Sequence, residues 1–133
     1  MKITFNYFFA ILSDIPSFYQ TGGGNFWAAM CNGQVVGTIA LIDIGNNQGV
    51  LRKMFVKAAY RGRVYNTAEL LLSMLILWAR EHSIYEIYLG TTDKFLAAHR
   101  FYEKKGFTRI AKETLPDTFS IMKVDTRFYM IKL

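Results

Sequence analysis

The sequence predicts an α/β (α+β) fold: a mixed sheet in which an antiparallel meander is followed by a parallel β-α-β crossover, with helices on both faces. Three apolar runs separated by turns, over residues 26–56, predict the meander. Helical periodicity over 67–82, followed by an alternating strand over 84–89, predicts the crossover. The later meander strands are almost continuously apolar, which indicates cover on both faces of the sheet.

Turn residues divide the meander. Its predicted strands are 26–31, 34–42 and 50–56. Asn32-Gly33 between the first two is typical of a type I′ hairpin turn, and the Gly- and Asn-rich stretch 45–49 predicts the next turn. Short connections of this kind join antiparallel neighbours.

The first helix of the crossover is predicted from Thr67 to about His82. Its apolar residues at helical spacing are Ala68, Leu71, Leu72, Leu75, Ile76 and Ala79. A strand over 84–89 follows and ends at Gly90.

A second helix is predicted next, with Thr92 or Asp93 as its N-cap and Gly106 directly after its C-cap. Pro116 then marks a loop between two further strands, predicted over 107–110 and 126–133.

Composition predicts a single domain over residues 1–133, because 133 residues suffice to bury a core. The hydrophobic share of 52% and the aromatic share of 16% argue against disorder. No apolar run approaches the ~18 residues of a membrane-spanning helix. The apolar stretch 7–12 lacks a signal-peptide cleavage pattern, so a cytoplasmic location is expected.

The single Cys31 and the distant His82 and His99 form no disulfide framework or zinc pattern, so no metal is expected. The net charge is +6, concentrated at 52–63 and 94–109 without a long basic tail. A ligand with several phosphates accounts for both concentrations. Nucleic-acid binding would rest on net charge and aromatic content alone.

Residues 50–77 organise the rest of the chain. An apolar strand passes through a short loop directly into the long helix, which leaves the first backbone N–H groups of that helix unpaired and favours an anion. Arg61 and Arg63 add positive charge at this place.

This loop resembles the acyl-CoA-binding motif of the GNAT superfamily of N-acetyltransferases, which reads Gln or Arg, two variable residues, Gly, one variable residue, and Gly or Ala. The matching residues are Arg63, Val64, Tyr65, Asn66, Thr67 and Ala68. Asn66 replaces the motif's glycine, but Asn readily adopts a positive φ, so the loop geometry is expected to survive. Arg61-Gly62, two residues earlier, indicates a slightly longer loop.

A second segment extends the resemblance to residues 26–133. Residues 100–107 are similar to the family's Leu or Phe followed by Tyr-Glu-Lys-x-Gly-Phe. The resemblance implies that Tyr102 lies near the thioester sulfur and protonates the departing thiolate as a general acid. The alternative is that Tyr102 only packs against the sheet, as Phe101 is expected to. Phe95 stands where the family often has Asn, so one cofactor contact is expected to differ.

The resemblance also implies acetyl-CoA as the cosubstrate. Backbone groups of Met54, Phe55 and Val56 are expected to bind pantetheine as an added pseudo-strand. The residues expected to hold the pyrophosphate are Arg61, Gly62, Arg63, Val64, Tyr65, Asn66, Thr67 and Ala68.

The general base is not identified by the sequence. The family often carries a Glu on the strand that here offers Arg52 and Lys53. The remaining alternatives are Asp43, Glu86 and Asp125. His99 is expected to be a surface residue rather than the base.

The part before Phe26 is shorter than in the family, where a strand and two helices wall the acceptor site. A short strand at 2–5, a helical or loop segment at 14–19 and a turn at Gly22-Gly23-Gly24 are expected here. Either the acceptor site is abbreviated or a second subunit completes it in a homodimer.

The predicted function is therefore acetyl-CoA-dependent N-acetylation of a small-molecule or peptide amine, by direct transfer within a ternary complex. A catalytically impaired acyl-CoA-binding module is the alternative. Neither nucleic acid nor a membrane is an expected partner.

Overall fold

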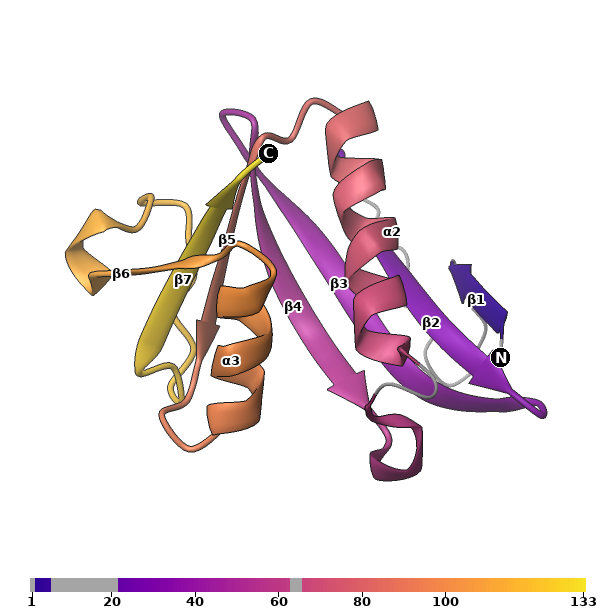
Figure 1. The fold of residues 1–133 in the computed structure, drawn as a ribbon. Helices are drawn as coiled ribbons and strands as arrows, with labels where there is room; N and C mark the ends of the chain where they lie inside the picture. The colour runs from indigo at the N-terminus through magenta and orange to yellow at the C-terminus, as the bar shows by residue number, and fades with distance from the viewer. Residues whose placement is uncertain (1, 6–21, 63–65) are drawn as a thin grey trace.

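The computed structural model describes residues 2–5, 22–62 and 66–133, which form a sheet of seven strands with two α-helices (Figure 1). The elements are β1 (Lys2–Phe5), β2 (Asn25–Cys31), β3 (Gln34–Gly45), β4 (Gln48–Val56), η2 (Ala58–Tyr60), α2 (Thr67–Glu81), β5 (Glu86–Thr91), α3 (Leu96–Lys104), β6 (Thr108–Ile110), η3 (Lys112–Thr114) and β7 (Arg127–Lys132). No described helix has the length and apolarity needed to cross a bilayer.

The strand order β1-β2-β3-β4-β5-β7-β6 confirms the predicted fold class. Strands β1 to β4 pair antiparallel, β4 and β5 pair parallel around α2, and β7 lies antiparallel between β5 and β6. The predicted strands and helices all occur, with bounds that differ by a few residues. The predicted segment 14–19 lies outside the described residues.

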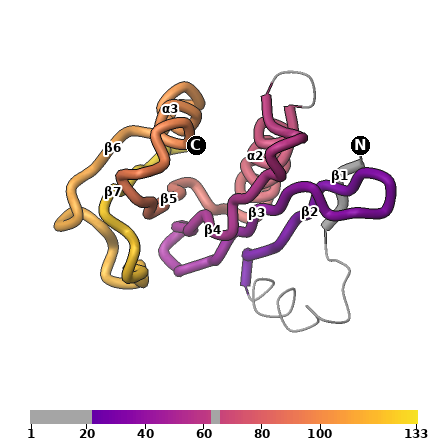
Figure 2. Tube along the Cα trace, turned by 90° about the horizontal axis from the view of Figure 1, so that it is seen from below, coloured from indigo at the N-terminus to yellow at the C-terminus, as the bar shows by residue number. Residues whose placement is uncertain are grey.

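Both faces of the sheet are covered. Helices were predicted on both faces, but the two described α-helices, α2 and α3, lie on the same face (Figure 2), where Leu71 and Leu75 of α2 join the main core. The opposite face is covered by the loop that contains η3, because Phe119 packs there against Val50 and Phe128. Alternate residues of β4 and β5 therefore belong to different cores, as the nearly continuous apolar runs predicted.

Two asparagines hold left-handed backbone, as their places in the sequence predicted. Asn32 and Gly33 have φ of 51° and 77°, the signs that a type I′ turn requires. Asn66, the N-cap of α2, has φ 51° and ψ 32°, the left-handed backbone that the sequence analysis expected an asparagine to adopt here.

The predicted N-cap of α3 was wrong. The N-cap is Phe95, and no side chain caps this helix. Thr92 instead closes a turn before the helix, because its carbonyl accepts a hydrogen bond from the Phe95 N–H at 3.3 Å. The Thr92 hydroxyl accepts a hydrogen bond from the Lys94 N–H at 3.5 Å in the same turn, and such local bonds compete with capping for short polar side chains.

Strands β4 and β5 diverge after a short stretch of parallel pairing (Figure 1). The pairing between them runs only from Gln48 with Glu86 to Val50 with Tyr88. Beyond it, the register of β4 with β3 shifts, and Lys53 has φ 55°, a positive value rare for a residue with a side chain. This bulge bends β4, and Thr38 Oγ1 holds it by donating to the Lys53 carbonyl at 2.6 Å.

Leu75→Ala is expected to destabilise the fold by about 2–5 kcal/mol, because Leu75 is 0% exposed at the centre of the α2 contact with the sheet. Leu77→Ala on the same helix is the matched control, since Leu77 is 55% exposed. Urea unfolding of the three proteins measures the difference. Equal losses in both variants would contradict this packing of α2.

Candidate functional site

The divergence of β4 and β5 opens a cavity of about 620 Å³. Its walls come from β4, from the end of β5, from α3 and from residues 118–125 of the loop before β7. Tyr102 and Ala98 line it on the helix side of the sheet, whereas Ile42 and Val50 line it on the opposite side. The cavity therefore extends through the sheet at the point where the two strands separate.

The edge of β4 that faces this cavity has no strand partner among the described residues after Val50. An unpaired strand edge offers backbone donors and acceptors to an extended ligand. Of the three predicted contact residues, Met54 lines the cavity, Phe55 is 50% exposed and Val56 is buried at the end of the strand. The Val56 carbonyl accepts a hydrogen bond from Arg61 Nε at 2.8 Å.

The start of α2 has the features of an anion site. The Asn66 side chain makes no capping hydrogen bond, so it satisfies none of the first-turn N–H groups, which favours an anion there. Thr67 is buried and Ala68 is half-buried beside this terminus. Gly62 has φ 92°, a value that favours glycine. The predicted residues Arg63, Val64 and Tyr65 lie outside the described residues.

One acidic residue stands in the first turn of α2, and a lysine neutralises it. Lys105 Nζ, just after α3, donates to Glu69 Oε1 at 2.7 Å. This hydrogen bond lowers the pKa of the Glu69 carboxyl, with a smaller effect from the Lys105 charge. The pair reduces the repulsion that an exposed carboxylate would exert on an anion at the helix N-terminus.

Tyr102 reaches the cavity from α3 and is only 6% exposed. Its ring packs edge-on against Phe107, with centroids 5.5 Å apart. Burial raises the pKa of the hydroxyl to about 12. Within the described part of the chain, this hydroxyl takes part in no hydrogen bond. Tyr102 thus packs against its neighbours and also presents its hydroxyl at the cavity wall. The sequence analysis had treated packing and a proton-donor role as alternatives.

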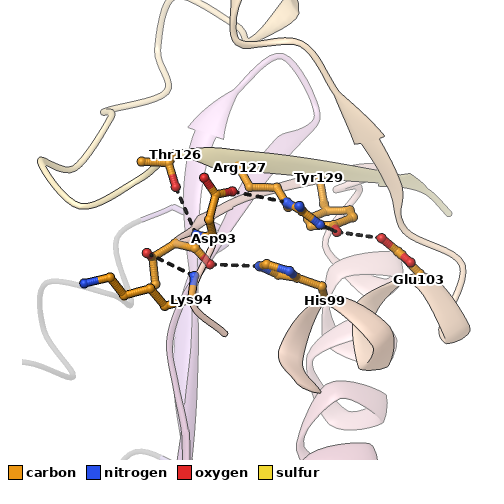
Figure 3. A network of polar contacts seen from close by, with 8 residues as sticks. Asp93, Lys94, His99, Glu103, Thr126, Arg127 and Tyr129 are labelled. Carbon is orange, nitrogen blue, oxygen red and sulfur yellow. Dashed lines mark hydrogen bonds and ion pairs between the residues drawn. The ribbon is translucent and has the colours of Figure 1, made fainter. Parts of the chain in front are cut away.

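His99 is not the surface residue that the sequence analysis expected. It is 3% exposed, and its Nε2 donates to the Thr92 carbonyl at 2.8 Å (Figure 3). Its Nδ1 has no partner among the described residues. His99 precedes Tyr102 by one helical turn, so both face the sheet, and this spacing is the signal in the sequence that favours a buried histidine. The histidine fastens α3 to the end of β5.

A polar network continues from this point along β7 (Figure 3). Tyr129 donates to Glu103 Oε2 at 2.7 Å and accepts from Arg127 Nη1 at 3.3 Å. Arg127 also pairs with Asp93 at 3.5 Å. These contacts hold the helix that carries Tyr102 against β7 and the β5–α3 turn.

Of the three acidic alternatives for a base, only Asp125 lines the cavity. Asp43 accepts hydrogen bonds from the backbone of Gly23 and Gly45. Glu86 accepts from Gln48 and Tyr88, and the Gln48 hydrogen bond is the main cause of its lowered pKa. Among the described residues, no three His, Cys, Asp or Glu side chains are placed to hold a metal ion.

The chain is similar in sequence to known acetyltransferases. It is 36% identical over 110 residues to an N-acetylaspartate synthetase from Danio rerio, a match that covers 79% of this chain and 38% of that protein. The chain thus spans well under half the length of that relative.

Solved structures show the same fold. The crystal structure of a GNAT-family acetyltransferase from Staphylococcus aureus has a TM-score of 0.86 and 42% identity, and covers 91% of this chain and 75% of that one. A Bacillus subtilis acetyltransferase in complex with CoA has a TM-score of 0.71 at 17% identity, covering 99% and 98% of the two chains. The sequence also matches the acetyltransferase (GNAT) family over residues 4–107. The chain therefore belongs to this family.

Proposed function

We propose that this chain is an acetyl-CoA-dependent N-acetyltransferase that transfers the acetyl group directly to an amine of a small molecule or peptide. The observation that carries the proposal is the cavity through the sheet, which has Tyr102 on its wall and opens where β4 leaves β5. Family membership, the similarity to an N-acetylaspartate synthetase and the CoA complex of the B. subtilis protein support it. One sheet with a core on each face supports a single domain over 1–133.

The donor would lie along the diverging strands. Backbone groups of Met54, Phe55 and Val56 would pair with the pantetheine arm, although the Val56 carbonyl already accepts from Arg61. The α2 N-terminus, including Asn66, Thr67 and Ala68, would hold the pyrophosphate together with the loop at 61–65.

The acceptor would enter from the opposite side of the sheet and meet the acetyl group inside the cavity. The amine attacks the thioester carbonyl, a C–N bond forms, and the C–S bond breaks. An amine R–NH₂ and acetyl-CoA give R–NH–CO–CH₃ and CoA-SH. Holding both reactants in one cavity lowers the entropic part of the barrier.

Tyr102 would stabilise the departing thiolate. With its pKa raised to about 12, the hydroxyl stays protonated throughout the neutral range. A thiol with a pKa near ~8.5 is the stronger acid, so a hydrogen bond to the developing charge contributes more than complete proton transfer. This refines the general-acid role that the resemblance implied.

Ala68→Glu is expected to abolish acetyl-CoA binding, because it places a carboxylate in the first turn of α2. For the parent, ligand in large excess of Kd should raise thermal stability by on the order of a few kcal/mol. Ser73→Glu, on the exposed face of the same helix, is the control and should keep this shift. Melting curves with and without millimolar acetyl-CoA test both. An unchanged shift in a folded Ala68→Glu protein would refute the pyrophosphate site.

Tyr102→Phe keeps the packed ring and removes the hydroxyl. Turnover of acetyl-CoA with an accepted amine should fall about 10²-fold, while acetyl-CoA affinity stays within about threefold. Tyr85→Phe, which removes a hydroxyl from a residue 47% exposed, should leave turnover unchanged. Steady-state kinetics across an amine panel, beside calorimetric binding, measure these effects. Parent-like turnover by Tyr102→Phe with chemistry rate-limiting would exclude the role.

Stability at high pH tests the burial of Tyr102 separately. Its pKa rises from about 10 in the unfolded chain to about 12 in the folded protein, so the unfolded state releases the proton first. The resulting stability is complete below pH ~10 and is lost as pH rises from there through ~12, at up to about 1.4 kcal/mol per pH unit. Tyr102→Phe should show a shallower loss in urea unfolding, and Tyr85→Phe the parent's slope. Identical slopes for parent and Tyr102→Phe would contradict a buried phenol.

A further inference from the structure

Two opposite charges line the cavity on the side away from α2. Arg52 follows Val50 and Leu51 on β4, and it shares the face of Val50 because its guanidinium lies 5.2 Å from the centre of the Phe119 ring. Its Nη2 donates to the Ser120 carbonyl. This hydrogen bond uses one of the five N–H donors of the guanidinium, which leaves further donors for a ligand.

Asp125 lies beside Arg52 and is more enclosed. Its side chain is 5% exposed, and its Oδ2 accepts from the Met122 N–H at 2.9 Å. Its Oδ1 accepts no hydrogen bond from the described residues. A Cβ added to Gly90 would lie 2.6 Å from the Asp125 carboxyl carbon, so the glycine is what lets this carboxylate lie against β5.

The two charges do not satisfy one another. Arg52 Nη1 and Asp125 Oδ2 are 3.9 Å apart, beyond hydrogen-bond length, although the side chains are only 14% and 5% exposed. A buried ion pair recovers its desolvation cost only with good geometry and further hydrogen bonds. The neighbouring wall, formed by Ile42, Ile44 and Val50, is apolar and supplies none. A ligand with both charges would complete the arrangement.

We propose that the acceptor is an amine that also carries a carboxylate, with the carboxylate bound by Arg52 and the ammonium bound by Asp125 before transfer. In an α-amino acid the two groups are separated by a single carbon, which suits charges 3.9 Å apart on one wall. This inference rests on the proposed function and specifies its acceptor. The competing explanation is that the pair only fastens residues 118–125 to the sheet.

The experiment compares each α-amino acid of a panel with its own amide and with the amine that lacks the carboxyl group. With acetyl-CoA saturating, the parent should prefer the free acid by at least about tenfold in kcat/KM, since a site built for a polar group rejects analogues without it. Calorimetry of the same compounds on the protein with CoA bound should show the same order. Equal use and equal binding of acids and amides would overturn the inference.

Variants of Arg52 and Asp125 then test which residue causes the preference for free acids over amides. Arg52→Gln should reduce the acid-to-amide ratio to within about threefold, and Arg52→Lys should restore part of it. Asp125→Asn should weaken acids and amides alike, because both carry the ammonium. Arg109→Gln, which removes an exposed arginine on β6, is the charge control and should keep the parent's ratio. An unchanged ratio in Arg52→Gln of parent-like melting temperature overturns the assignment.

These outcomes are distinct from failure of the proposed function. A chain that shows no acetyl-CoA melting shift and no transfer to any amine would overturn the function itself. A chain that transfers acetyl groups without preference for acids overturns only the inference. If CoA binds without transfer, the calorimetric comparison of acids and amides still decides between a zwitterion site and a structural pair.

Discussion

The parting of β4 from β5 is the constraint on which the site depends. Three residue pairs join these strands, and the bulge at Lys53 then turns β4 away from its neighbour. The Thr38 hydroxyl stabilises the strained backbone at Lys53 by a hydrogen bond, so the bulge is a feature of the β3–β4 hairpin itself. The cavity, the unpaired strand edge and access from both sides of the sheet all follow from this one departure from regular pairing.

Much of the fold could be predicted because its determinants are local. Apolar periodicity located α2, and the dipeptide Asn32-Gly33 located a turn whose φ values it favours. The left-handed backbone of Asn66 was also predictable, because asparagine adopts a positive φ more readily than other residues with side chains. The N-cap of α3 could not be predicted, because Thr92 can either cap the helix or form a turn before it. The turn forms, with the Thr92 carbonyl accepting from the Phe95 N–H, and the contact of the same carbonyl with His99 favours it.

The site was predictable only in part. Tyr102 stood in a recognisable motif, but its burial, which raises its pKa, also depends on Tyr129 of β7, far away in the sequence. Arg52 and Asp125 are far apart in the sequence and meet only because residues 118–125 fold over the opposite face of the sheet. No spacing rule relates such a pair, so sequence reasoning could list Asp125 among three acids but could not choose it.

The short parallel pairing between β4 and β5 also bears on how the two parts of the sheet could move relative to each other. It divides the sheet into a β1–β4 part, packed under α2, and a β5–β7 part that carries α3. A small rotation between these parts would alter the width of the cavity and the distance of Tyr102 from β4, and the main core that α2, β5 and Tyr102 share would resist it. The three residue pairs from Gln48 to Val50 would thus set how closely the donor and the acceptor of the proposed transfer are held.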